Sequence, residues 1–208
     1  GEKRVKNAYN KKSEIVYPGV DYTYFDRNYN KEELENKWNL SGSYIIGQVA
    51  SITTEKNHEM IIKIINRLIG EIPTLKYIII GDGPTKKHLE DIVTANNLED
   101  RVIFTGRVSE EKLVELFHLI DLLLDPTITS TWGLTQFEAL VCNTPCIASK
   151  VSGSSIILNR YNIGLVAKPK REDFKNKINY AYTNKKDLDD LVRRGKLYVK
   201  NNLTWRHY

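Results

Sequence analysis

The sequence of 208 residues has only two cysteines and no long hydrophobic run. Cys142 and Cys146 lie four positions apart inside an apolar stretch, which indicates reduced core thiols rather than a disulfide framework. No run approaches the roughly 18 to 20 apolar residues that a membrane span needs. The opening GEKRVKNAYNKK lacks the apolar centre of a signal peptide. These absences predict a cytoplasmic protein without a membrane span.

Several motifs that carry chemistry are also missing. The four histidines are scattered and none pairs with another at metal-ligand spacing, so we expect no metal site. There is no Gly-x-Ser-x-Gly elbow and no Walker loop, which argues against hydrolase and NTPase chemistry. The GDGP stretch at 81–84 is too short for a dinucleotide fingerprint and is interpreted as a structural turn.

The charge balance is modest: 31 Lys and Arg against 26 Asp and Glu give a formal charge of +5. A solvated, lysine-rich surface explains this value, and we expect no nucleic-acid partner. Two further interpretations stay open, namely affinity for an anionic substrate and peripheral contact of the lysine-rich N-terminal segment with the inner membrane face.

Short apolar runs alternate with segments of helical length and period along most of the chain. The runs predicted to be buried strands are 44–50, 75–80, 101–105, 120–124 and 145–148. The segments predicted to be helices are 57–68, 85–96, 110–119, 133–141, 171–183 and 186–202. This alternation predicts an α/β fold, a Rossmann-like doubly wound parallel sheet with helices on both faces.

In such a sheet, ligands bind at the carboxyl ends of the strands. Lys56 lies in the first loop there, beside Thr53, where it either contacts a phosphate or is simply exposed. Glu138 lies on an otherwise apolar helix, and a charged carboxylate there needs hydrogen-bond donors. A ribose diol and a structural salt bridge meet that need equally well.

An ordered set of motifs spans nearly the whole chain. It comprises IVYPGVD, VASITTEKNH, IIIGDGP, VIFTGRVSEEKL, DLLLDPT, WGLTQFEALVCNTPCIAS and NIGLVAKP. This set resembles the C-terminal, donor-binding domain of family 4 retaining glycosyltransferases, which have the GT-B fold of two Rossmann-like domains. The resemblance implies that a nucleotide sugar binds here without a metal or other cofactor, and that an N-terminal domain of the same protein binds the acceptor.

The resemblance also implies roles for individual residues. Lys56 would contact the diphosphate, backbone groups of Arg107 and Val108 the nucleobase, and Glu138 the ribose hydroxyls. The remaining residues implied at the donor are Ser51, Thr53, Trp132, Gly133, Leu134 and Thr135, with backbone N–H groups of the last three facing the distal phosphate or sugar. Ser130 would join Lys56 as a catalytic candidate.

The chain departs from the family pattern at three positions. Ser130 replaces the first of two glutamates, Ser51 replaces an arginine, and Ile156 replaces a glutamate. Because all three changes alter polar donor contacts, a second hypothesis is a degenerate, non-catalytic domain that binds a partner. A nucleotide-sugar epimerase of the same fold is a third.

The sequence predicts three parts. Residues 1–30 form an inter-domain linker with an initial strand at 14–17 and an Asp/Asn-rich connection. Residues 31–170 form the Rossmann-like nucleotide-sugar-binding domain. Residues 171–208 form C-terminal helices that continue toward the acceptor domain. The predicted function is transfer of a hexose to a glycan, lipid-linked or protein-linked acceptor.

Overall fold

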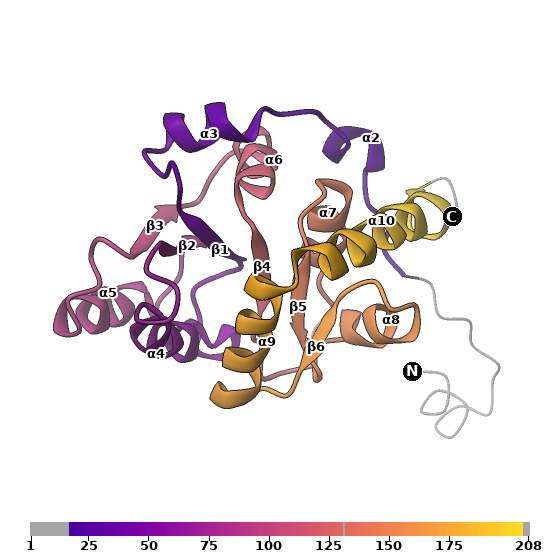
Figure 1. Ribbon diagram of the computed structural model, residues 1–208. Coiled ribbons are helices and arrows are strands. Elements are labelled where there is room, and N and C mark those ends of the chain that lie inside the picture. Colours follow the sequence, from indigo (N-terminus) through magenta and orange to yellow (C-terminus); the bar gives the residue numbers. More distant parts are fainter. Residues whose placement is uncertain (1–16, 131, 206–208) are drawn as a thin grey trace, which may run out of the picture.

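The computed structural model of the chain, described over residues 17–130 and 132–205, is built on a six-stranded parallel sheet (Figure 1). The strands are β1 Tyr44–Val49, β2 Leu75–Ile80, β3 Val102–Gly106, β4 Leu122–Asp125, β5 Cys146–Ser149 and β6 Leu165–Ala167. Their order is β3-β2-β1-β4-β5-β6. The direction of winding therefore reverses between β1 and β4, where loops diverge to opposite faces and leave a crevice.

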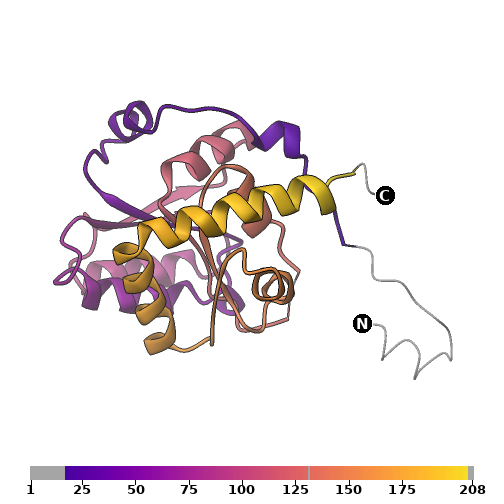
Figure 2. The ribbon, with the colours of Figure 1, turned by 45° about the vertical axis from the view of Figure 1, so that its right-hand side comes forward.

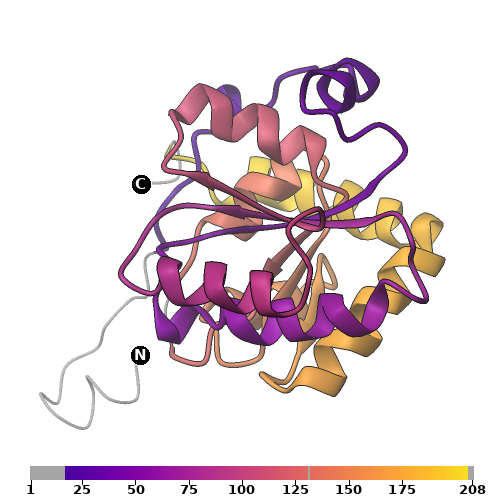
Figure 3. The same cartoon turned by 90° about the vertical axis from the view of Figure 1, so that its left-hand side faces the viewer.

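Helices cover both faces of the sheet. They are α2 Tyr22–Phe25, α3 Lys31–Lys37, α4 His58–Leu68, α5 Lys86–Ala95, α6 Glu110–Leu119, α7 Thr135–Val141, α8 Ser154–Arg160, α9 Arg171–Thr183 and α10 Lys185–Asn202, with a 3₁₀ turn η1 at Thr54–Lys56. Figure 3 shows α4 and α5 on one side of the sheet and α6 on the other. The predicted doubly wound, Rossmann-like α/β fold is confirmed.

The strands are buried on both faces because each face has its own hydrophobic core. On β1, Tyr44 and Ile46 join the core beneath α4, α5 and α9, whereas Ile45 between them joins the core beneath α3 and α6. Alternate side chains of a strand point to opposite faces, so burial on both sides requires a continuous apolar run. This explains why Tyr44, Ile45 and Ile46 form an uninterrupted hydrophobic run.

The predicted helices and strands in the central and C-terminal parts agree closely with the structure. The helices at Glu110–Leu119 and Arg171–Thr183 have the predicted bounds, and Ser109 caps the first of them by accepting a hydrogen bond from Lys112 N at 3.3 Å. The other predicted segments end within two residues of the observed ones. Flanking loops and caps, rather than the apolar pattern, set those last residues.

Three α-helices and one strand in the described part of the chain were not predicted. The helix α8 and the strand β6 lie between the last predicted strand and α9. The connection assigned to the Asp/Asn-rich stretch is wrong over α2, which Asp21 caps by accepting from Tyr24 N at 3.0 Å. The helix α3 buries only Leu34, so it lacks an apolar period. The strand expected at 14–17 falls, apart from Tyr17, outside the described residues.

The last two helices pack on the same body as the sheet. Phe174 and Ile178 of α9 enter the core on the α4 side, and α10 lies across α7. The end of α10 returns to the beginning of the described chain, where Val20 N donates to Leu203 O at 2.6 Å (Figure 2). The two ends of the described chain are therefore held side by side.

Two glycines in the GDGP turn allow the loops after β1 and β2 to touch. A Cβ atom on Gly83 would lie 2.3 Å from the carbonyl oxygen of Ile52, and one on Gly81 would lie 2.1 Å from that of Ala50. Backbone hydrogen bonds close the same contact, with Ile52 N donating to Asp82 O at 3.0 Å. The turn is structural, as the sequence predicted, and it fixes the path of the loop that carries Lys56.

We predict that Gly83→Ala lowers the free energy of unfolding by about 1 to 3 kcal/mol, because the added methyl group meets backbone atoms that cannot rotate away. Thermal denaturation checks this, at roughly 2 to 4 °C per kcal/mol for a chain of this size. Gly70→Ala is the matched control, since a Cβ there meets nothing within 4 Å. Equal melting temperatures for both variants would contradict the prediction.

Candidate functional site

The loops after β1 and β4 meet at the crevice and are bonded to each other. The carbonyl oxygen of Glu55 accepts hydrogen bonds from Ile128 N at 2.9 Å and from Thr127 Oγ1 at 3.1 Å. Two residues further on, Asn57 Nδ2 donates to Pro126 O at 3.2 Å. The two loops therefore form one rim, and the residues predicted on them lie on the same side of the molecule.

Lys56 is held at this rim through its backbone. Its carbonyl oxygen accepts from the buried side-chain amide of Gln48 at 2.7 Å, and the Gln48 Oε1 atom accepts from Tyr77 OH at 2.6 Å. The next residue, Asn57, has a φ of 56°, and this left-handed turn separates η1 from α4. The Lys56 side chain is half-buried and forms no ion pair with any described residue.

A carboxylate that was not predicted lies near this lysine. Asp125 is the last residue of β4; it accepts from the Gln136 side-chain amide and, at 3.4 Å, from Thr127 N. Burial raises the pKa of Asp125, and hydrogen bonding to Ser152 together with the charge of Lys56 opposes that rise. Its sequence signal is a charged residue at the end of the buried run DLLLD, at the carboxyl edge where ligands bind.

Glu138 lies on α7 and is half-buried. Within the described part of the chain, no hydrogen bond or salt bridge engages its carboxylate, so the salt-bridge interpretation finds no partner there. Burial, and secondarily the negative charge of Glu110, raises the pKa of Glu138 to about 7. A desolvated carboxyl facing a second negative charge is ready to accept hydrogen bonds from a ligand.

The electrostatic effect of Glu110 on Glu138 indicates that the loop after β3 lies near Glu138. Glu110 is the first residue of α6 and follows the loop that holds Arg107 and Val108. Arg107 is exposed, whereas Val108 is half-buried against the core beneath α3 and α6. The loop implied to contact the nucleobase is therefore adjacent to the carboxylate implied to contact the ribose.

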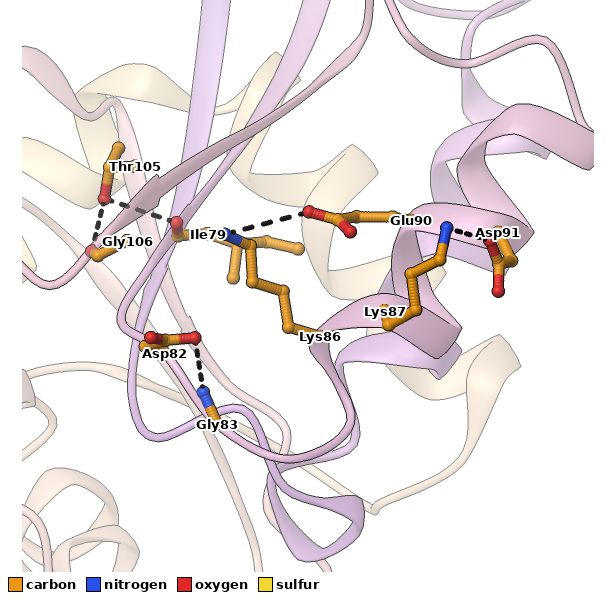
Figure 4. Close-up of polar contacts among 9 residues, drawn as sticks. All are labelled: Ile79, Asp82, Gly83, Lys86, Lys87, Glu90, Asp91, Thr105 and Gly106. Atoms are coloured by element: carbon orange, nitrogen blue, oxygen red, sulfur yellow. Dashed lines mark hydrogen bonds and ion pairs between the residues drawn. The ribbon is translucent and has the colours of Figure 1, made fainter.

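Figure 4 shows the neighbouring turn and the start of α5. The Asp82 carboxylate accepts from Gly83 N at 2.8 Å, and Lys87 pairs with Asp91 one helical turn further on, at 2.7 Å. Lys86 likewise extends toward Glu90, at 3.7 Å. Both lysines form ion pairs with carboxylates of α5, whereas Lys56 forms none in the described part of the chain.

The segment before α7 contains the other implied donor contacts. The Trp132 ring stacks between Tyr17, at a centroid distance of 4.4 Å, and Phe137, at 5.8 Å. No side chain caps the start of α7, where the first N–H groups of a helix lack intrahelical partners. Gly133, Leu134 and Thr135 are all half-buried there.

The structure brings some of the predicted residues together more closely than others. Lys56 and the segment before α7 share the rim of the crevice. Ser51 and Ser130 lie exposed on the loops of that rim, and Thr53 is half-buried. Arg107 and Val108 follow β3, which lies two strands from β1. They are related to the crevice through Glu110, which follows them in the chain and whose charge acts on Glu138.

Sequence reasoning missed Gln136 as well as Asp125. Gln136 is buried on α7, and its amide joins that helix to the end of β4. A polar residue between Thr135 and the apolar Phe137 was the available signal, since buried polar groups need partners.

Comparison with known proteins gives a family. The sequence model described as Glycosyl transferases group 1 matches residues 30–198. An uncharacterised glycosyltransferase of Methanocaldococcus jannaschii is 27% identical over 166 residues, which are 78% of this chain and 42% of that protein. The N-acetyl-alpha-D-glucosaminyl L-malate synthase of Bacillus anthracis is 26% identical over 78% of this chain and 40% of its own length. The chain thus spans about two fifths of these relatives.

Solved structures share the fold. The Anabaena protein HepE, solved in complex with UDP-glucose, superposes with a TM-score of 0.84 at 18% identity, over 92% of this chain and 53% of HepE. The C-terminal domain of the group 1 glycosyl transferase LpcC of Francisella tularensis gives a TM-score of 0.80 at 21% identity, over 90% of this chain and 100% of that one. The fold described above therefore matches that of GT-B glycosyltransferases.

We predict that the protonated Glu138 carboxyl contributes stability to the ligand-free chain and that this contribution is lost as the pH rises from about 5 to about 8. The folded state holds the Glu138 proton up to about pH 7, whereas an unfolded glutamate loses it near 4.5, so the unfolded state binds fewer protons across this interval. The loss is up to about 3 kcal/mol, and Glu138→Gln should remove most of it.

Urea denaturation of both proteins at the two pH values measures this difference. Glu32→Gln, at an exposed position of α3, is the control and should follow the unmodified chain. If Glu138→Gln also follows it, Glu138 is not the titrating group.

Proposed function

The chain belongs to the glycosyl transferases group 1 family, and we propose that it is the half of a retaining glycosyltransferase that binds a nucleotide-sugar donor. The observation that carries the proposal is the Glu138 carboxylate, which is half-buried beside the crevice and has no partner among the described residues. A ribose diol supplies two hydroxyl donors to such a group. Ligand hydroxyls would compensate the desolvation that now raises its pKa.

Lys56 supports the same assignment from the opposite side of the crevice. Its ammonium group lies at the end of β1 without an ion-pair partner in the described part of the chain, whereas Lys86 and Lys87 nearby are paired with carboxylates. A diphosphate is the anion that fits a lone ammonium group next to the uncapped start of α7. N–H groups of Gly133, Leu134 and Thr135 would add donors to its distal oxygens.

The comparisons support uridine diphosphate as the nucleotide part of the donor. HepE, which shares the fold, was solved with UDP and with UDP-glucose. Related proteins bear names such as 2-deoxystreptamine glucosyltransferase and Alpha-monoglucosyldiacylglycerol synthase, and both names specify transfer of glucose. We propose a UDP-hexose as donor, with the base held by backbone groups of Arg107 and Val108.

In the proposed reaction, the bond between the anomeric carbon and the diphosphate oxygen breaks. The acceptor hydroxyl oxygen bonds to the same face of the sugar, and its proton passes to the leaving diphosphate. Negative charge develops on the leaving diphosphate, and preorganised donors stabilise it most effectively. Lys56 and the start of α7 supply such donors, so we propose that no metal ion takes part. Ser130 would hydrogen-bond a sugar hydroxyl as a neutral group.

The acceptor side of the reaction lies outside this chain. Because the chain spans about two fifths of its relatives, we propose that an N-terminal domain of the same protein closes over the crevice and holds a glycan, lipid-linked or protein-linked acceptor. The three departures at Ser51, Ser130 and Ile156 favour one alternative, a donor domain that has lost catalysis and binds a partner. The two functions differ in sugar turnover.

We predict that UDP and UDP-glucose raise the melting temperature of the chain, whereas the ADP and GDP counterparts do not. Ligand at about 100 times its dissociation constant stabilises by about 2.7 kcal/mol, or roughly 5 to 10 °C here. Lys56→Ala and Glu138→Ala should abolish most of the shift in differential scanning fluorimetry. Lys63→Ala, which removes a lysine of α4 that pairs with Glu59, is the matched control.

A shift of equal size in all three variants would place the nucleotide elsewhere. No shift with any nucleotide at millimolar concentration would remove the donor-site proposal for the isolated chain.

We predict further that the full-length protein transfers hexose and that the isolated chain does not. In the full-length protein, Lys56→Ala should lower kcat by about 10²- to 10³-fold, because one charge-stabilising donor is lost. Radiolabelled UDP-hexose with a panel of acceptors measures this transfer. Absence of turnover in a folded full-length protein that binds UDP would support the partner-binding alternative instead.

A further inference from the structure

Two long stretches of the sequence contain no aspartate or glutamate. They are 139–171 and 191–208, and they contribute basic residues throughout. The first stretch includes β5, α8 and β6, and the second includes the C-terminal half of α10. The chain as a whole has a nearly balanced charge. These two acid-free stretches form one basic surface only if the fold places them side by side.

They do meet, beside the outer strand β6. Arg194 Nε on α10 donates to Asn162 O after α8 at 3.1 Å, and the rings of Tyr161 and Tyr198 lie 4.3 Å apart. Arg160 stacks on the Tyr161 ring at 5.6 Å. Figure 2 shows α8 below α10 on the same side of the molecule. The acid-free stretches therefore form one continuous surface.

A groove of about 600 Å³ runs along the outer side of α8. Three cations line it, Lys150, Arg160 and Lys168, and none of them forms an ion pair within the described part of the chain. The acidic side chain on its lining, Asp173, accepts a hydrogen bond from the backbone N–H of Lys168. The groove thus presents three positive charges against one carboxylate.

Large apolar side chains protrude among these charges. Ile156, on the groove itself, is 64% exposed. Val151 and Tyr161 are also exposed. We name the set Lys150, Val151, Ile156, Arg160, Tyr161 and Lys168 the α8 surface. Protruding apolar groups surrounded by cations suit a soft anionic surface, in which the aliphatic groups enter the hydrocarbon boundary and the cations meet headgroups.

We propose that the α8 surface docks the protein onto an anionic phospholipid bilayer. Charge complementarity carries the choice of partner, since the three unpaired cations outnumber the one carboxylate that lines the groove, Asp173. The exposed aromatic Tyr161 suits the headgroup level. The geometry differs from that of a pocket for a soluble anion, because the cations come from three separate elements and the apolar groups project outward.

The α8 surface lies to one side of the donor crevice. Lys150 after β5 and Lys168 after β6 lie at the carboxyl edge of the sheet, and α8 runs from there to Arg160 at the opposite edge. Lys56 follows β1, which β4 separates from β5 and β6, so a bilayer against the α8 surface leaves the rim with Lys56 open to ligand. The proposal goes beyond donor binding and stands without it.

Co-sedimentation with vesicles tests the proposal. The chain should bind vesicles of phosphatidylglycerol and phosphatidylcholine and leave vesicles of phosphatidylcholine alone in solution, with binding weakened by raised salt. The triple variant Lys150→Gln, Arg160→Gln and Lys168→Gln should bind on the order of a hundredfold more weakly, at about fivefold per charge.

A matched control removes three other exposed lysines from the opposite half of the sheet: Lys37→Gln, Lys87→Gln and Lys112→Gln. Both triple variants lower the formal charge by three, so the control should bind like the unmodified chain if the α8 surface is the docking site. Circular dichroism confirms that both variants are folded.

Equal losses in the two variants would overturn the proposal in favour of a net-charge effect. The proposal would also be overturned if the unmodified chain did not prefer anionic vesicles. An acidic protein would then be the favoured partner of the same cations. An Ile156→Ser variant that binds anionic vesicles as tightly as the unmodified chain would remove the apolar part of the argument.

Discussion

The carbonyl oxygen of Glu55 accepts two hydrogen bonds from the loop after β4, and the shape of the crevice depends on this junction. The strands β1 and β4 are neighbours from which the sheet winds in opposite directions, so their loops have no helix in common to hold them together. Backbone bonds at Ile128 and Thr127 replace that support. The positions of Lys56 and of the segment leading to α7 follow from it.

The crevice holds charges that the fold does not neutralise. Lys56 has no carboxylate partner in the described structure, while burial raises the pKa of both Asp125 and Glu138. A site selected only for stability would pair these groups or replace them, because desolvating an unpaired charge is costly. These unpaired groups lie at the point where the winding of the sheet reverses. This is the pattern expected of a binding site, in which a ligand supplies the partners that the charged groups lack.

The architecture was predictable from the sequence because its physics is local and repetitive. Continuous apolar runs such as LKYIII can be buried on two faces only inside a parallel sheet, and α4 shows its isoleucine stripe at helical spacing. The helix α3 was missed because Leu34 alone contacts the core. The helix α8 was missed because its serines, buried at its start, read as a loop in the sequence.

The site was predictable only in part, for a different physical reason. Lys56 and Glu138 stand out as charges at the end of a strand and on an apolar helix, whereas the environment of Asp125 arises from Gln136 and Ser152, which approach it through the fold. The alternative of a salt bridge for Glu138 also needed coordinates, since the charge that acts on its pKa belongs to another carboxylate, Glu110. Pairing is a property of three-dimensional contacts, and one sequence does not contain it.

The two surfaces of the molecule differ in how their charges are organised, and this difference fits two kinds of partner. In the crevice, Lys56 lies at a single backbone-fixed position near two carboxyl groups, so a ligand there must match the spacing of both signs. On the α8 surface, three cations sit on exposed side chains that form no ion pair with a described residue, and Asp173 is the carboxylate beside them. A rigid arrangement of both signs discriminates among small molecules, whereas exposed and mainly positive side chains adapt to a fluid interface.

The helix α8 joins the two surfaces. It begins beside Ser152, which contacts Asp125, and it ends at Arg160. A bilayer bound along the outer side of α8 would therefore fix the orientation of the crevice relative to the membrane plane.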